Sequence, residues 1–161
     1  MNFQRIFWVA LLMMGASVSV KAQPVQGQPA KEVALPSVSG DTVRLSSLRG
    51  KVVLLDFWAS WCGPCRISNK GLAKIYSKYK DKGFEILGVS LDDEKEKWQK
   101  AVRQDKITWL QVNDAGGEKL GADWQLGAIP TSYLIDKDGK LLAMDLQGKE
   151  LEKALKYLLD K

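Results

Sequence analysis

Residues 56–66, which read Asp-Phe-Trp-Ala-Ser-Trp-Cys-Gly-Pro-Cys-Arg, decide the fold of this chain. They contain its only two cysteines, Cys62 and Cys65, with two residues between them. An apolar run precedes the pair and a helical pattern follows it. The dithiol is therefore predicted where a strand leads into a helix N-terminus, a position that lowers the pKa of a thiol and makes it reactive.

The sequence on either side of the dithiol predicts how the two sulfur atoms differ. Residues 51–58 form a nearly continuous apolar run, which is typical of a central strand covered on both faces. A helix is predicted over 62–82 because apolar side chains recur with helical spacing, at Leu72, Ile75, Tyr76 and Tyr79. Cys65 lies seven residues before Leu72 and should point inward, whereas Cys62 should lie exposed in the first turn.

The remaining segments predict an α/β fold with a central mixed sheet flanked by helices and an N-terminal β-hairpin extension. The hairpin is expected over 33–45, around a turn at 39–41. The later elements are strands at 84–89 and 107–112, helices ending near 106 and at 119–126, a hairpin of 131–136 with 140–145, and a helix at 151–158. Because strands and helices alternate before the last hairpin, helices should lie on both faces of the sheet.

The N-terminal residues predict export. Residues 1–22 are expected to be a signal peptide, since Arg5 precedes an apolar stretch too short to be a comfortable membrane span. Small residues before Gln23 fit cleavage at that point, and an uncleaved N-terminal anchor is the alternative. Residues 23–32 are predicted to be a linker and 33–161 a single domain. We therefore expect a periplasmic protein.

Charge and composition exclude one class of partner. The net charge of +5 falls to +3 once Arg5 and Lys21 leave with the signal peptide. The remaining surplus is spread along the chain, with no run of Lys and Arg interleaved with aromatic residues. A nucleic-acid partner is therefore not supported.

Two cysteines this close together favour redox chemistry over a structural role. A disulfide between Cys62 and Cys65 would close a very short loop and constrain the unfolded chain little. A zinc site needs four ligands, but the chain has no other cysteine and no histidine. A c-type haem site needs a histidine after the second cysteine, where Arg66 stands instead. We expect no metal and no dissociable cofactor.

The helix position gives the two cysteines different tasks. Cys62, at the helix N-terminus, should attack a substrate disulfide, and the buried Cys65 should then resolve the mixed disulfide. Asp56 is anomalous inside an apolar run, and burial should raise its pKa and make it a proton acceptor or donor for Cys65. The alternative is an aspartate at a strand end that reaches solvent.

Residues 57–65 strongly resemble the active-site strand and turn of thioredoxin. The wider chain, over residues 33–160, resembles the exported TlpA/ResA-like branch of thioredoxin-fold proteins. That resemblance also rests on three other segments, which are 45–51, 129–131 and 133–139. It implies a thioredoxin-like fold and thiol–disulfide oxidoreductase activity.

The resemblance also implies roles for individual residues. Pro130 matches a cis-proline that lies against the dithiol, and the Ile129 backbone would pair with an extended substrate segment. A trans proline that starts a strand is the alternative for Pro130. Asp56 matches the buried acid beneath the resolving cysteine. The expected substrate groove comprises Trp61, Gly63, Pro64, Ile129 and Thr131.

One position departs from the ResA-like pattern. Ser68 stands three residues after the second cysteine, where ResA-like proteins typically carry a glutamate. Gly63, Pro64 and Asp56 match thioredoxin instead. The resemblance therefore does not extend to the role in cytochrome c maturation that is usual for the ResA branch.

The sequence thus predicts a monomeric reductase of protein disulfides that a membrane electron donor recycles. The Gly63–Pro64 dipeptide favours reduction, since thioredoxin has a potential of about −270 mV. One alternative is a peroxiredoxin-like thiol peroxidase, although Ala59 stands where a peroxidase would need threonine. Another is a non-enzymatic module that binds a client in the groove near Pro130.

Overall fold

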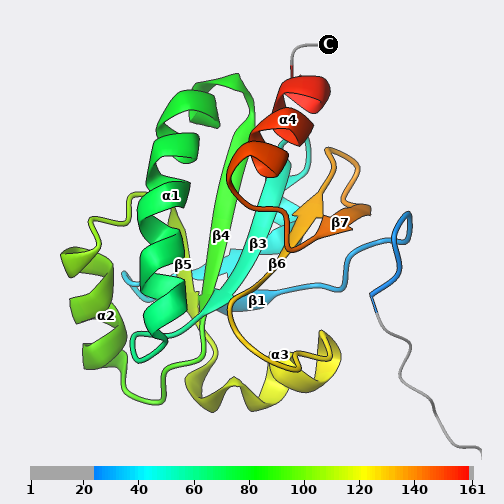
Figure 1. The fold of residues 1–161 in the computed structure, drawn as a ribbon. Coiled ribbons are helices and arrows are strands. Elements are labelled where there is room, and N and C mark those ends of the chain that lie inside the picture. The colour runs from blue at the N-terminus through cyan, green and yellow to red at the C-terminus, as the bar shows by residue number, and fades with distance from the viewer. Residues whose placement is uncertain (1–23, 160–161) are drawn as a thin grey trace, which may run out of the picture.

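A computed structural model describes residues 24–159 of the chain. The predicted signal peptide, 1–22, lies outside the described residues. Five strands form the central sheet in the order β5-β4-β3-β6-β7 (Figure 1). Their bounds are β3 Val52–Trp58, β4 Phe84–Ser90, β5 Leu110–Asn113, β6 Thr131–Ile135 and β7 Leu141–Met144.

The sheet is mixed, as predicted. β3 pairs in parallel with β4, and β4 in parallel with β5, whereas β6 pairs antiparallel with both β3 and β7. A separate two-stranded antiparallel sheet, β1 Ala34–Pro36 with β2 Thr42–Arg44, is the expected N-terminal hairpin. The thioredoxin-like fold predicted from the sequence is therefore confirmed.

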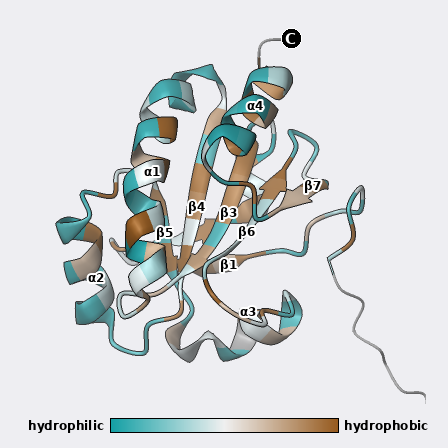
Figure 2. Cartoon of the chain, in the orientation of Figure 1, coloured by the Kyte–Doolittle hydropathy of each residue, from teal (hydrophilic) through white to brown (hydrophobic). Residues whose placement is uncertain are grey.

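Four α-helices complete the described fold. Their bounds are α1 Gly63–Tyr79, α2 Lys95–Gln104, α3 Glu118–Asp123 and α4 Gly148–Leu159. Short 3-10 segments occur at Leu45–Leu48, Lys80–Lys82 and Ala115–Gly117. α1 and α4 cover one face of the sheet, while the N-terminal hairpin and α3 pack against the other. Figure 2 shows apolar residues along the central strands and polar residues on the outer faces of the helices.

Alternation along β3 directs its side chains into two different cores. Val53, Leu55 and Phe57 pack with the hairpin and α3, whereas Val52 and Leu54 pack with α1 and α4. Asp56 and Trp58 share the parity of Val52 and Leu54, so they face α1. All seven residues of the strand are buried, as the continuous apolar run predicted. This geometry places an acid directly under the first turns of α1.

Part of the predicted linker follows the edge of the sheet. The Gly27 N–H donates to the Leu141 carbonyl at 2.7 Å, and the Leu141 N–H donates to the Gln28 carbonyl at 2.9 Å. The Ala30 N–H donates to the Gly139 carbonyl at 2.9 Å. In contrast to the linker expected over 23–32, residues 27–30 are tied to the β6–β7 hairpin by backbone hydrogen bonds, because the outer edge of β7 offers free backbone groups.

Candidate active site

Cys62 and Cys65 form a disulfide at the start of α1, with 5.3 Å between their Cα atoms. Cys62 is the N-cap of the helix, and its Sγ accepts a hydrogen bond from the Cys65 backbone N–H at 3.2 Å. Pro64 occupies the first helical turn, where its missing N–H leaves no intrahelical bond broken. The strand-to-helix position predicted for the dithiol is confirmed.

The prediction that Cys62 is exposed was wrong for this disulfide form. Cys62 is 5% exposed and Cys65 1% exposed, and both pack in a cluster with Trp58, Ala59 and Trp98. The cover also comes from the loop before β6, because the Ile129 carbonyl oxygen lies 3.8 Å from Cys62 Sγ. A disulfide sulfur carries no hydrogen, so this approach is a contact that a reduced thiol could turn into a hydrogen bond.

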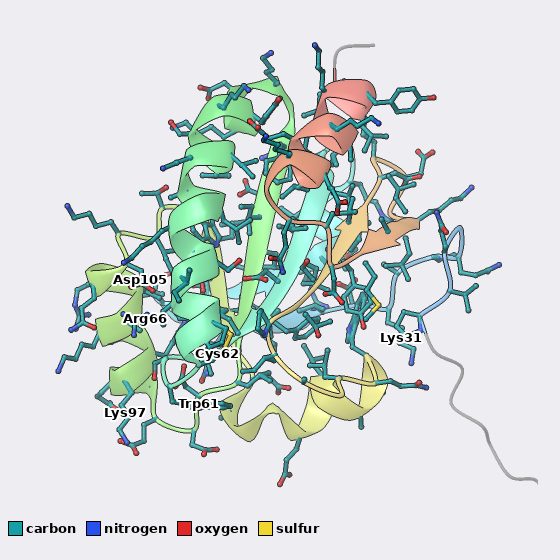
Figure 3. The ribbon with its side chains drawn as sticks, in the orientation of Figure 1. Lys31, Trp61, Cys62, Arg66, Lys97 and Asp105 are labelled. Carbon is teal, nitrogen blue, oxygen red and sulfur yellow. A yellow bond between two sulfur atoms is a disulfide. The ribbon has the colours of Figure 1, made fainter. Side chains whose placement is uncertain are left out.

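An exposed rim surrounds the buried disulfide. Trp61 is 68% exposed, and Gly63 and Pro64 are exposed beside it. Figure 3 shows Trp61 and Cys62 together at the end of α1 where the helix begins. These residues form an exposed surface next to the sulfur atoms.

The loop before β6 supplies the opposite wall. The Ile129–Pro130 peptide bond is cis, as the resemblance implied, which excludes the trans alternative. The Thr131 hydroxyl donates to the Ala128 carbonyl at 2.9 Å and ties the start of β6 to the loop. The structure therefore brings Ile129 and the dithiol together from distant parts of the chain.

Asp56 lies buried under this site, with 4% of its surface exposed. Burial, aided by the nearby Asp145 carboxylate, raises the pKa of Asp56 to about 7. No described side chain donates a hydrogen bond to its carboxyl group. The alternative of a strand-end aspartate in solvent is therefore excluded, and Asp56 can exchange a proton near neutral pH.

A cavity of about 120 Å³ connects Asp56 with the cis-proline. Its polar lining includes Ser68 of α1, Ser132 of β6 and Asp145, which follows β7. The Ser132 N–H donates to Asp145 Oδ1 at 2.8 Å, which holds that carboxylate at the cavity wall. A polar space of this size has room for water, which could carry protons between Asp56 and solvent.

Arg66 has a structural partner. Its guanidinium forms a two-pronged ion pair with Asp105, at the end of α2, and donates to the Ser60 carbonyl at 3.1 Å (Figure 3). The Asp92 carboxylate binds the same loop, because it accepts hydrogen bonds from the Ser60 N–H at 2.9 Å and from the Ser60 hydroxyl at 2.6 Å. These bonds fix the loop that precedes Cys62. The Arg66 guanidinium is paired with Asp105, so its role is to hold this loop in position.

Two further properties of the described residues concern metal binding and membranes. Within 24–159, no group of three or more histidine, cysteine, aspartate or glutamate side chains could hold a metal ion. No helix in that range is long and apolar enough to cross a membrane.

The model of the AhpC/TSA family matches residues 26–144. The chain belongs to this family. Among curated proteins, the thiol-disulfide oxidoreductase ResA of Bacillus cereus is 33% identical over 135 residues, which cover 84% of this chain and 77% of the relative. The ResA of Geobacillus kaustophilus is 36% identical over 115 residues, or 71% of this chain and 66% of the relative.

Solved structures of the same class superpose on this member of the AhpC/TSA family. The thioredoxin domain of a thiol-disulfide oxidoreductase from Bacteroides vulgatus has a TM-score of 0.79 and 34% identity, covering 84% of this chain and 98% of that one. A thiol-disulfide oxidoreductase from Bacteroides fragilis has a TM-score of 0.76 and 36% identity, covering 82% and 100%. Together with the Cys62–Cys65 pair, these findings identify a thioredoxin-like thiol–disulfide oxidoreductase.

Sequence reasoning missed Asp145 and Gln111 as neighbours of Asp56. Asp145 shares the cavity with it, and Gln111 lies in the same cross-strand row. Neither residue belongs to a motif, and only the strand register brings them near the site. A polar Gln111 in a predicted strand was the one available clue, because buried polar residues in strands need a partner.

Proposed function

We propose that this AhpC/TSA family member is an exported, periplasmic reductase of protein disulfides. The observation that carries the proposal is the placement of the Cys62–Cys65 disulfide, at a helix N-terminus and 3.8 Å from the Ile129 carbonyl. A backbone wall beside a reactive sulfur fits an extended peptide better than a small molecule, because a strand-like segment can pair with the free backbone groups.

In the reduced enzyme, the Cys62 thiolate attacks one sulfur atom of a client disulfide. The client S–S bond breaks, one client thiolate leaves, and a mixed disulfide joins Cys62 to the client. The Cys65 N–H, which points at Cys62 Sγ at 3.2 Å, and the N-terminus of α1 both stabilise the attacking thiolate.

Cys65 then resolves the mixed disulfide. Its thiol gives a proton to Asp56, and the resulting thiolate attacks Cys62 Sγ. The second client sulfur leaves as a thiolate and takes up a proton, so the client gains two electrons and two protons while the Cys62–Cys65 disulfide forms. A pKa of about 7 suits Asp56 to this transfer, since both of its protonation states are populated near neutral pH.

The groove for the client comprises Trp61, Gly63, Pro64, Ile129 and Thr131. Trp61 offers a large exposed apolar surface, and Ile129 offers its backbone to an extended segment. Pro130 follows Ile129 in the loop before β6 and lines the cavity that contains Asp56. A monomer is sufficient for this chemistry, since every proposed site residue lies in one chain.

The predicted signal peptide supports a periplasmic location for this chemistry. Because that compartment is kept oxidising, a membrane electron donor must return electrons to the Cys62–Cys65 disulfide after each turnover. The family's fold and cysteine pair fit such an exchange, in which the donor's thiol attacks the same disulfide.

A trapping experiment tests the assigned roles. Cys65→Ser should accumulate mixed disulfides through Cys62 when the reduced protein meets exported proteins that carry disulfides, because nothing resolves them. Cys62→Ser is the matched control and should trap none. Clients trapped by Cys62→Ser but not by Cys65→Ser would reverse the two roles.

The AhpC/TSA match also makes a thiol peroxidase the second candidate. The position before the dithiol that a peroxidase would fill with threonine holds Ala59, which is fully buried and offers no hydroxyl. Peroxide consumption should therefore stay at background with the reduced protein. A non-enzymatic binding module, by contrast, would keep its function in a Cys62→Ser, Cys65→Ser double variant, whereas the proposed reductase loses all turnover.

A further inference from the structure

Gln111 belongs to a row of cross-strand neighbours that runs through Asp56. Gly88 of β4 is paired with Asp56 of β3 on one side and with Gln111 of β5 on the other. Paired residues on adjacent strands direct their side chains to the same face of the sheet. Gln111 and Asp56 therefore both point to the face that α1 covers (Figure 1).

The missing side chain at Gly88 lets Gln111 reach over the intervening strand. A Cβ atom at Gly88 would lie 2.1 Å from Gln111 Nε2, so the amide occupies the space that any other residue would fill. Adjacent strands are about 4.8 Å apart, which places this amide about one strand spacing from Asp56.

Trp58 fixes which end of the amide faces Gly88. The Trp58 indole N–H donates a hydrogen bond to Gln111 Oε1 at 2.9 Å. Because the indole nitrogen can only donate, the amide oxygen must face it and the NH₂ group must point away. The arrangement of the two amide atoms is therefore dictated by chemistry.

The NH₂ group of Gln111 is an unpaired donor in the protein interior. Gln111 is 5% exposed, and its Nε2 has no hydrogen-bond partner among the described residues. Buried polar atoms without a partner are uncommon and call for an explanation. Asp56, on the far side of Gly88 in the same row, is a buried carboxyl group that accepts no hydrogen bond from the described residues.

We propose that Gln111 is a positioning residue for Asp56, whose ionised carboxylate accepts a hydrogen bond from the Gln111 amide across Gly88, directly or through one water. The inference rests on the proposed role of Asp56 as the proton acceptor for Cys65. A neutral carboxyl group attracts the donor weakly, whereas the carboxylate attracts it strongly. Gln111 thereby keeps part of Asp56 ionised, and so available as a base, near neutral pH.

Gln147, two residues after Asp145, also lines the cavity that contains Asp56, but it is exposed to solvent, whereas Gln111 is buried. The remaining groups around Asp56 offer no amide donor. Asp145, at the end of β7, opposes ionisation through its like charge. On α1, Cys65 is the proton donor when reduced, and Ser68 lines the cavity. On β6, Ser132 faces the same cavity. α4 contributes Gly148 to the lining and no titratable group. Gln111 is thus the amide donor on the opposite side from Asp145.

The test is the pKa of Asp56 in Gln111→Met, measured by carbon NMR titration of its carboxyl group in the oxidised protein. Methionine keeps the length of the side chain and removes the amide. We expect the pKa to rise by about one unit, which lowers the ionised fraction at pH 7 about fivefold. Resolution by Cys65 at pH 7 should slow by the same factor. In an Asp56→Asn background, the same substitution should leave that rate unchanged.

Gly88→Ala tests the same inference without altering Gln111. The added methyl group displaces the Gln111 amide from above residue 88 and should therefore also raise the pKa of Asp56. Gly88→Ala tests the proposal by itself if Gln111→Met fails to fold. An Asp56 pKa within about 0.2 units of the parent value in the folded variants would overturn the proposal. The titration needs no catalysis, so a shifted pKa in a protein that reduces no disulfide would contradict the proposed function alone.

Discussion

At the scale of single residues, Asp56 links stability to pH. Its pKa of about 7 in the folded protein lies above the value of an unfolded aspartate, because burial disfavours the charged form. The unfolded chain therefore loses this proton first as pH rises. The stability that Asp56 contributes is complete below about pH 4 and is lost as pH rises through about 7.

Asp56→Asn should abolish this dependence. The difference in unfolding free energy between the variant and the parent should shift by about 4 kcal/mol in favour of the variant from pH 4 to pH 8. Urea unfolding of both oxidised proteins at the two pH values measures it. Parallel pH profiles would show that Asp56 titrates normally.

Ser68 offers a second test of the environment of Asp56. Ser68→Glu places an acid in the shared cavity, where its negative charge should raise the pKa of Asp56 further. Ile67→Glu is the matched control, because Ile67 lies on the same helix and is 72% exposed. A glutamate at that position adds the same charge but places it in solvent. NMR titration should find a clear upward shift in the first variant and almost none in the second. Equal shifts would place Ser68 outside the electrostatic reach of Asp56.

Residue roles carried by a local motif could be predicted from the sequence, and those carried by register could not. Cys62, Cys65 and Asp56 lie within one short stretch, so their placement followed from strand and helix patterns. Asp145 and Gln111 reach the site only through pairing across the sheet. The burial of Cys62 was mispredicted because Trp98 of α2 and the loop around Ile129, which cover it, are distant in the sequence.

At the scale of elements, the beginning of α1 is held by the end of α2. Arg66 and Asp105 have side chains that are 26% and 7% exposed, and Asp105 also accepts from the Asn69 amide at 3.1 Å. The dithiol therefore sits on a helix whose first turn is anchored from the side, which keeps Cys62 aligned with Ile129.

Asp105→Asn should lower the unfolding free energy by about 1 to 2 kcal/mol, since it leaves a partly buried guanidinium without its charged partner. Lys97→Gln breaks the exposed Lys97–Glu94 pair on α2 and should leave the unfolding free energy unchanged within experimental error (Figure 3). Chemical denaturation compares the two variants. An equal loss in both would mean that the Arg66–Asp105 pair contributes no more than a surface contact.

The helices and strands themselves were well predicted, and the deviations have physical causes. The expected strand at 107–112 begins only at Leu110, because Trp109 and Ile107 pack into the core beside α1 before pairing starts. The sequence alone could not distinguish the expected linker from a segment that pairs with the edge of the sheet, because its polar residues show no periodic pattern. Backbone hydrogen bonds to the free edge of β7 hold this segment in place.

At the scale of the whole molecule, the direction of electron flow follows from the balance between the dithiol and the disulfide. The helix N-terminus stabilises the Cys62 thiolate and so favours the reduced form of the dithiol. The buried site disfavours a negative charge on Asp56, whose pKa is raised to about 7, and so disfavours a carboxylate beside that thiolate. Gly63 and Pro64, between the cysteines, match the dipeptide of thioredoxin, whose potential is low.

The reduction potential of the Cys62–Cys65 couple tests the claim of a reductase most directly. The measurement equilibrates the purified protein in glutathione buffers of graded potential and quantifies the reduced fraction by thiol alkylation. We predict a value near that of thioredoxin, about −270 mV, at which the reduced protein can donate electrons to client disulfides. A value near that of the strong oxidant DsbA, about −120 mV, would contradict the account and make the protein an oxidant of its clients.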